Sequence, residues 1–190
     1  IVAICHNITG SHFNPIVTLS FMFRRDNGKM KINLGIWYII VQILGCIVGC
    51  LLAYMLLENG GSLRFENDEY SFQAAFSETL GSFLYVFVFL IHTGAETKFS
   101  NDPAIWSFIL AATYGSVTHY NSSKISASIN PAYALGVYIT RLCDEGTDQS
   151  HFLWVFVLFP FVGALLSLIF YEFVYKKASE LPEQPPNKPI

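Results

Sequence analysis

The sequence ISASINPAYALG, residues 125–136, places the pair Asn130-Pro131 at the start of an apolar segment. The same pair, Asn14-Pro15, begins a second apolar segment near the start of the chain. Asn is a favoured N-cap residue, and Pro suits the first helical turn, where the N–H that it lacks would have no partner. Each pair therefore predicts the start of a helix.

Composition places these helices in a membrane. Of the 190 residues, 53% are hydrophobic and 13% are charged, against about 25% charged residues in a typical soluble domain. Four apolar runs are long enough, or nearly so, to cross a bilayer, which takes about 20 residues. They cover residues 32–57, 72–92, 104–120 and 152–175, and the third is the shortest. We expect an all-α membrane protein, and the net charge of −3 does not suggest nucleic acid as a partner.

The segments that begin with the Asn-Pro pairs, residues 15–23 and 131–140, are too short to cross. Each gives a helix of about 15 Å at 1.5 Å per residue, which is half of an apolar core about 30 Å thick. Irregular backbone at membrane depth is tolerated only where it is buried in protein or lines a water-filled cavity. Two such half-helices therefore predict a pore or a binding site.

An internal repeat relates the two halves of the chain. Asn14 and Asn130 lie 116 residues apart, and the segments IVGCLLA and FVGALLS align Gly49 with Gly163, which lie 114 residues apart. Two matches at nearly one offset indicate a duplicated unit. Gly49 also completes a G-x-x-x-G pattern with Gly45, which is typical of close helix contacts in membranes.

Basic residues orient the chain, because lysine and arginine concentrate in cytoplasmic segments. If residues 24–31 are cytoplasmic, alternation along the chain puts eight basic residues inside and three outside. The first half-helix then ends inside and the second ends outside, near Arg141. The repeats are therefore inverted, and both half-helix N-termini point to the membrane midplane. We expect the Pro-rich tail, residues 176–190, to be cytoplasmic and disordered.

Two facing helix N-termini have an electrostatic consequence. Each carries about half a positive charge, so together they repel cations. The side-chain oxygens of Asn14 and Asn130 can cap their helices and leave the NH₂ groups free as donors to a neutral molecule such as water. A water held by two donors uses its oxygen as acceptor and does not relay protons in line. The pattern predicts a pore that excludes cations and protons.

The sequence resembles the major intrinsic protein family, which comprises the aquaporins and glycerol facilitators. The matching segments are GSHFNPIVTL, WYIIVQILGCIVG, FQAAFSETLGSF, INPAYALG and PFVGALLSLIFY. The resemblance implies six tilted helices and two re-entrant half-helices in an inverted repeat, assembled as a homotetramer. It also implies a passive channel with no enzymatic activity, cofactor or metal, whose partners are water or small neutral solutes and membrane lipid.

Compared with the family, the chain starts inside the first repeat. We expect the remnant of that repeat in residues 1–57, an extracellular loop in 58–71, a complete second repeat in 72–175 and the tail in 176–190. The remnant holds the end of helix 2, the first half-helix and helix 3. Helix 1 and most of helix 2 are lacking, so we expect the natural protein to continue upstream by at least about 45 residues.

The resemblance also assigns residues to the pore. The midplane boxes are Asn14, Pro15, Ile16, Asn130, Pro131 and Ala132, the outer constriction contains Thr118, Ala127 and Tyr133, and His12, Gln42 and Glu78 support them. An acid inside an apolar run faces the protein interior, and the resemblance makes Glu78 an acceptor for loop amides, with a proton relay as the alternative.

Two departures from the family pattern bear on selectivity. Ile16 replaces the alanine of the first box, and Tyr133 stands where the family usually has arginine. The leading interpretation is a water channel driven by osmotic gradients. The small side chains of Thr118 and Ala127 favour the alternative of a channel for a broader range of small neutral solutes, such as glycerol, urea or ammonia. A non-conducting structural membrane protein is the third interpretation, with Ile16 and Tyr133 blocking the path.

Overall fold

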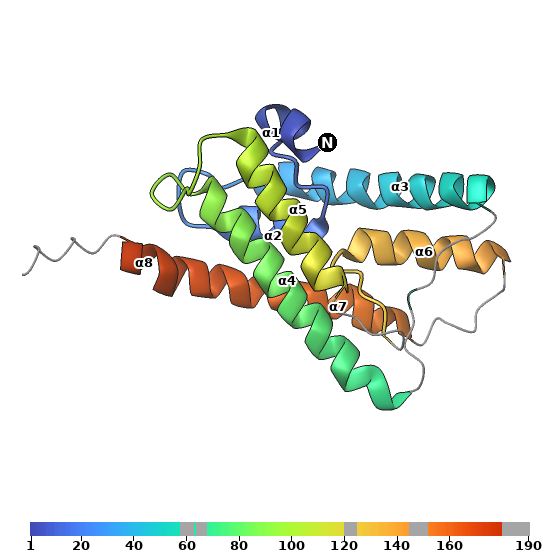
Figure 1. The fold of residues 1–190 in the computed structure, drawn as a ribbon. Helices are drawn as coiled ribbons and strands as arrows, with labels where there is room; N and C mark the ends of the chain where they lie inside the picture. The colour runs from blue at the N-terminus through green and yellow to red at the C-terminus, as the bar shows by residue number, and fades with distance from the viewer. Residues whose placement is uncertain (58–62, 64–67, 120–124, 145–151, 180–190) are drawn as a thin grey trace, which may run out of the picture.

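The computed structural model describes residues 1–57, 63, 68–119, 125–144 and 152–179. Its fold is all-α, as predicted (Figure 1). The helices are α1 (Val2–Thr9), α2 (Pro15–Phe23), α3 (Ile32–Leu57), the 3₁₀ turn η1 (Asp68–Tyr70), α4 (Ser71–Thr93), α5 (Pro103–His119), α6 (Pro131–Asp144), α7 (Leu153–Phe170), the π-helical turn η3 (Tyr171–Tyr175) and α8 (Lys176–Ser179).

Three helical segments of the described residues are long and apolar enough to cross a membrane. They are Ile32–Leu57, Ser71–Thr93 and Leu153–Ser179, with 26, 23 and 27 residues. The fourth expected crossing, α5, has 17 residues, in line with its being the shortest apolar run. The first half-helix, α2, matches the expected segment 15–23.

Two expected boundaries were wrong. The second half-helix, α6, has 14 residues rather than the ten of segment 131–140, and at 1.5 Å per residue it is about 21 Å long. No Gly or Pro lies between Thr140 and Asp144, and Arg141 in the last turn is favourable beside the negative end of the helix dipole. The tail expected from residue 176 is helical as far as Ser179, while residues 180–190 lie outside the described part.

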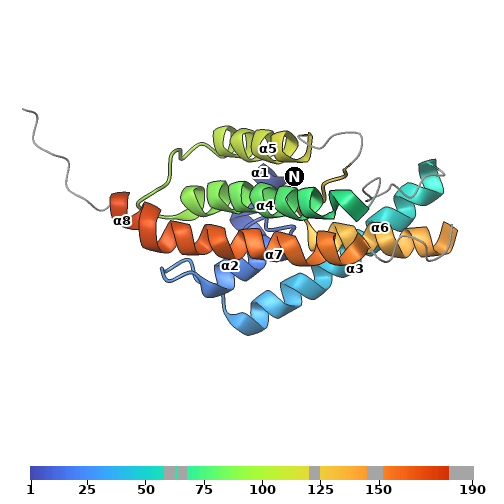
Figure 2. The same cartoon turned by 90° about the horizontal axis from the view of Figure 1, so that it is seen from below.

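Figure 2 shows α5, α4 and α7 stacked in that order, with α2 on the far side of α7. The helices α4 and α7 make the most extensive contact, and α3 lies alongside α6. A Cβ added at Gly163 of α7 would overlap the carbonyl oxygen of Thr79, and one at Gly136 of α6 would lie 2.8 Å from the carbonyl oxygen of Cys46. These two glycines therefore let the helix backbones approach closely.

The G-x-x-x-G contact expected at Gly45 and Gly49 does not occur among the described residues. Apart from the adjacent residues and the backbone of α3 itself, no described atom lies within 4 Å of a Cβ built at either glycine. Both glycines lie in the apolar stretch of α3 with which this helix could cross a membrane, and no residue of that stretch is buried. The pattern marks small residues on a helix surface but does not identify their partner, and the close glycine contacts occur on α6 and α7 instead.

Buried polar contacts hold the C-terminal end of α2. Arg24 is 1% exposed, and its guanidinium donates to the hydroxyl of Thr93 at 3.0 Å and pairs with Asp26 at 2.5 Å. The next backbone N–H, of Arg25, donates to Glu172 of η3 at 2.8 Å. These bonds tie the half-helix to α4 and to the end of α7, so they fix its position relative to the second repeat.

We predict that Gly163→Ala destabilises the protein, because the added methyl group meets backbone atoms of α4 that have no room to move. Overpacking of this kind costs about 1–3 kcal/mol. The thermal unfolding midpoint of detergent-purified protein should fall. Gly45→Ala is the matched control and should leave the midpoint unchanged or raise it, since Ala favours a helix over Gly by about 1 kcal/mol. Equal midpoints for the two variants would contradict the close approach of α7 to α4.

Candidate pore site

Both asparagines of the Asn-Pro pairs cap their helices. The side-chain oxygen of Asn14 accepts from the N–H of Ile16 at 3.1 Å, and that of Asn130 accepts from the N–H of Ala132 at 3.1 Å. Asn14 has the extended backbone that is usual for an N-cap, with φ −153° and ψ 127°. The two pairs therefore start two helices through the same local geometry.

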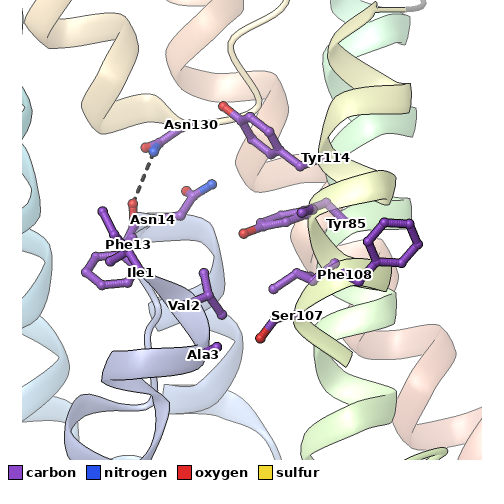
Figure 3. Close-up of a pocket in the computed structure, with 12 residues that line it drawn as sticks. Ile1, Val2, Ala3, Phe13, Asn14, Tyr85, Ser107, Phe108, Tyr114 and Asn130 are labelled. Atoms are coloured by element: carbon purple, nitrogen blue, oxygen red, sulfur yellow. Dashed lines mark hydrogen bonds between the residues drawn. The ribbon is translucent and has the colours of Figure 1, made fainter. Parts of the chain in front are cut away.

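The two capping side chains also join the half-helices to each other. The Nδ2 of Asn14 donates to the carbonyl oxygen of Ile129 at 2.8 Å. The Nδ2 of Asn130 donates to the carbonyl oxygen of Phe13 at 3.1 Å, and Figure 3 shows this second bond. We expected both NH₂ groups to be free for a passing molecule, and this was wrong in part. One N–H of each amide is used in the cross-contact, so one N–H of each remains.

The residue before each asparagine has an unusual backbone conformation. Phe13 has φ 46° and Ile129 has φ 50°, in the left-handed region that non-glycine residues rarely adopt. Such a residue costs about 1–3 kcal/mol and persists only where its surroundings hold it. In both repeats the carbonyl of this residue accepts the bond from the opposite asparagine. Sequence reasoning missed both residues, although the 116-residue offset that relates Asn14 to Asn130 also relates Phe13 to Ile129.

Glu78 holds the turn before α6. Its two carboxylate oxygens accept from the backbone N–H groups of Ser128 at 2.6 Å and of Ile129 at 2.8 Å. The side chain is fully buried, and the Ser128 hydroxyl donates to the carbonyl oxygen of Asn130 at 2.8 Å. The carboxylate thus lies directly beside the strained residue, where two charge-assisted bonds oppose relaxation of Ile129. This is the contact with loop amides that the resemblance implied for Glu78.

The first half-helix is held by neutral groups around Thr18, a residue that the sequence did not single out. The Nε2 of Gln42 on α3 donates to the hydroxyl of Thr18 at 2.9 Å, and the Nδ1 of His12 lies 3.2 Å from the same oxygen. That hydroxyl also donates to the carbonyl of Asn14 at 3.3 Å. His12 packs its ring on Phe21 at 4.5 Å. Gln42 and His12 therefore support the first Asn-Pro box through their contacts with the Thr18 hydroxyl.

A cavity of about 510 Å³ lies beside the two asparagines. One wall is formed by Phe13, Asn14 and Asn130, and Figure 3 shows Tyr85 of α4 and Tyr114 of α5 across from them. The residues that complete the lining are Ile1, Val2, Ala3, Ser107, Phe108, Leu110 and Ala111. Sequence reasoning missed both tyrosines, because nothing in an apolar helix run shows which face it turns to a cavity.

Ile16 lies away from this cavity. Its side chain is fully buried and belongs to the main core cluster. Ala132, the corresponding residue of the other half-helix, is also fully buried. Neither lines the cavity beside the asparagines. Ile16 therefore fills a packing position in the core and does not obstruct the path past Asn14.

The structure does not bring the three expected constriction residues to the cavity wall. The Thr118 hydroxyl donates to the carbonyl of Tyr114, one turn earlier on α5, at 2.8 Å, and Ala127 packs against the core. Tyr133 is 39% exposed and is not among the lining residues. Thr118 follows Tyr114 by four residues and so continues the cavity-facing side of α5. The outer constriction stays a prediction.

No group of three or more His, Cys, Asp or Glu side chains with metal-site geometry occurs within the described ranges. The chemistry of the site is that of hydrogen-bond donors and acceptors around a cavity beside two helix N-termini. The described chain thus combines helices that are long and apolar enough to cross a membrane with two short helices that begin at the Asn-Pro pairs.

Comparison with known proteins gives the family. Residues 1–171 match the Major intrinsic protein family, and the chain belongs to this family. It is 25% identical over 180 residues to a probable aquaporin PIP2-6 of Oryza sativa subsp. japonica, covering 90% of this chain and 62% of the relative. It is 28% identical over 180 residues to a probable aquaporin PIP2-5 of Arabidopsis thaliana, covering 89% and 60%. The chain spans about three fifths of the length of these curated relatives.

A solved structure has the same fold. The aquaglyceroporin from Plasmodium falciparum matches 93% of this chain and 78% of its own with a TM-score of 0.79 and 19% sequence identity. The fold class predicted from the sequence, an aquaporin-like all-α membrane protein, is therefore confirmed.

We predict that Glu78→Gln destabilises the protein. A glutamine offers one acceptor oxygen and turns an NH₂ donor toward one of the two backbone N–H groups, so at least one bond is lost. A bond to a charged group contributes about 1.5–3 kcal/mol. The thermal unfolding midpoint in detergent should fall, whereas Glu96→Gln, at an exposed position, should leave it unchanged. A Glu78→Gln midpoint equal to that of the parent would show that the carboxylate does not hold the turn.

Proposed function

We propose that the protein is a passive channel for water, driven by osmotic gradients. The observation that carries this proposal is the pair of asparagine amides at the apposed N-termini of α2 and α6, each with one N–H left beside a cavity. The names of the relatives, which are aquaporins, support the same function. The expected midplane residues, Asn14, Pro15, Ile16, Asn130, Pro131 and Ala132, are part of this proposal, with Ile16 in a packing role.

The site excludes ions through electrostatics. Each helix N-terminus carries about half a positive charge, and the two meet at the amides, so a cation approaching from either side is repelled. A water molecule at this point accepts from the remaining N–H groups of Asn14 and Asn130. Its oxygen is then occupied as an acceptor, so it cannot take up a proton from the next water in line.

A broader range of neutral solutes is the second candidate function. It is favoured by Tyr133, which replaces the family's usual arginine and removes a fixed charge, and by the small side chains of Thr118 and Ala127. A non-conducting role has less support, because Ile16 is buried in the core and Tyr133 does not line the cavity. Neither residue fills the space beside the asparagines.

The proposal extends to the assembly. We place the protein in the membrane as a homotetramer with a cytoplasmic C-terminus, residues 1–57 as the remnant of the first repeat, 58–71 as an extracellular loop and 72–175 as the second repeat. Most of segment 58–71 lies outside the described residues, apart from residue 63 and the turn η1 with the start of α4. Cross-linking and labelling of the tail on intact cells test the oligomer and the orientation.

Stopped-flow light scattering tests the channel itself. Vesicles that contain the protein should shrink faster than empty vesicles in an impermeant osmolyte, and they should show no added proton or potassium conductance. The same vesicles in glycerol and urea gradients separate the two candidate functions. Rates equal to those of empty vesicles for every solute would overturn both.

We predict that Tyr133→Arg makes the channel more selective for water. A guanidinium restores the fixed positive charge and the N–H donors that the phenol of Tyr133 lacks, and these are expected to make the outer path less permeable to solutes other than water. The ratio of glycerol to water permeability should fall roughly tenfold, equivalent to about 1.4 kcal/mol. Tyr138→Arg on the same helix is the control for an added charge. An unchanged ratio would make Tyr133 a packing residue and would remove the reason for expecting broad selectivity.

A further inference from the structure

The cavity beside the asparagines has a second polar wall. Tyr85 of α4 and Tyr114 of α5 line it opposite Asn14 and Asn130, and Figure 3 shows both hydroxyl ends directed toward the asparagine side. Tyr85 and Glu78 are seven residues apart on α4, so they share one face of that helix two turns apart. The same helix face therefore positions the turn before α6 and presents a hydroxyl to the cavity.

Packing fixes the direction of the tyrosines. The rings of Tyr85 and Tyr114 meet edge to face with centroids 5.4 Å apart, and Tyr85 also meets Phe89 edge to face at 6.4 Å. Ser107, Leu110 and Ala111 lie on α5 at spacings of seven, four and three residues before Tyr114, so they form one cavity-facing side of that helix. Neither hydroxyl can turn away from the cavity without disturbing these contacts.

The Tyr85 hydroxyl has unused hydrogen-bonding capacity. The side chain is 8% exposed, yet its hydroxyl has no hydrogen bond to any residue that the structure describes. A buried Tyr O–H usually has a partner, so this group is available to whatever occupies the cavity. The Tyr114 hydroxyl donates to the carbonyl of Ser128 at 3.4 Å, which leaves its oxygen free to accept.

The two walls differ in chemistry. Asn14 and Asn130 offer only donors to the cavity, because their oxygens cap the helices. The tyrosine oxygens can accept. A solute with a carbonyl on one side and N–H groups on the other matches this arrangement, since its oxygen accepts from the two asparagines while its N–H groups donate to the two tyrosines. Against an apolar wall, these N–H groups would lose their hydrogen bonds to water and would gain no bonds from the protein in return.

We propose that Tyr85 and Tyr114 form, with Asn14 and Asn130, a two-sided binding site for small uncharged amides of the urea type. Tyr85 is the residue of this site that determines specificity, because its hydroxyl has no other described partner. The inference rests on the proposed channel function and adds to it a solute class and the residues that select it. Water also passes the site, but its O–H groups lie closer to its oxygen than the N–H groups of an amide lie to the carbonyl oxygen, so one water molecule spans the two walls less well.

The test uses the single variants Tyr85→Phe and Tyr114→Phe, which keep the packed rings and remove only the oxygens. Vesicles with each variant are compared with the parent for water, urea and glycerol permeability. The ratio of urea to water permeability should fall about fivefold for Tyr85→Phe, the effect of one hydrogen bond, and less for Tyr114→Phe. Tyr175→Phe is the matched control, because Tyr175 is a tyrosine outside the cavity lining and its loss of an oxygen should change no ratio.

A competition measurement separates binding from a general change in the pore. Urea at equal concentration on both sides should slow water flow driven by sucrose in the parent, because a held solute occupies the path. This slowing should be weaker in Tyr85→Phe.

If the parent conducts water but Tyr85→Phe leaves the urea ratio and the slowing unchanged, the inference is wrong while the channel function stands. If glycerol permeability falls as much as that of urea, the site does not select amides. If the parent conducts nothing above empty vesicles, the channel function fails, and the inference fails with it.

Discussion

Two hydrogen bonds between the asparagine side chains and the opposite turns hold the centre of this molecule together. Asn14 donates to the carbonyl of Ile129, and Asn130 donates to the carbonyl of Phe13. They join two helix N-termini whose partial positive charges repel each other. Without them the two helix ends would lack these direct bonds against their mutual repulsion, and the remaining N–H groups would be less firmly held beside the cavity. The approach of α2 to α6 and the proposed ion barrier both depend on this pair of bonds.

The side chains that support these bonds differ between the two half-helices, although the two turns have similar backbone geometry. On the α6 side a buried carboxylate, Glu78, accepts two backbone N–H groups. Its negative charge also lies near the positive end of α6, which reduces the repulsion between the two helix ends. On the α2 side the neutral groups of Gln42 and His12 meet at the hydroxyl of Thr18. The two turns thus share one backbone geometry, although the groups that hold them differ.

The sequence was sufficient to predict the features that depend on local sequence rules, such as helix starts and helix lengths. The Asn-Pro pairs gave the helix starts, the apolar runs gave α3, α4 and α5 within a residue or two, and the 116-residue offset related the two boxes. The left-handed φ of Phe13 and Ile129 was not predictable, because neither is a glycine and the conformation is imposed by the opposite box. The glycine contacts were misassigned for a similar reason. Gly45 and Gly49 carry the pattern, but only tertiary structure shows that Gly163 and Gly136 are the glycines against which another backbone packs.

The polar groups at the centre of an apolar protein also indicate where a solute passes. A polar group buried without a partner costs free energy, so the turns before α2 and α6 use nearly every donor and acceptor that they contain. Beside the cavity, one N–H on each asparagine and the hydroxyls of Tyr85 and Ser107 have no partner among the described residues, and Tyr85 lies across the cavity from the asparagines. An oxygen-bearing solute or water in that space completes the hydrogen bonding that the chain leaves open. In the proposed channel, side chains on α4 and α5 therefore contribute to selectivity together with the Asn-Pro boxes, and the family pattern alone does not reveal that contribution.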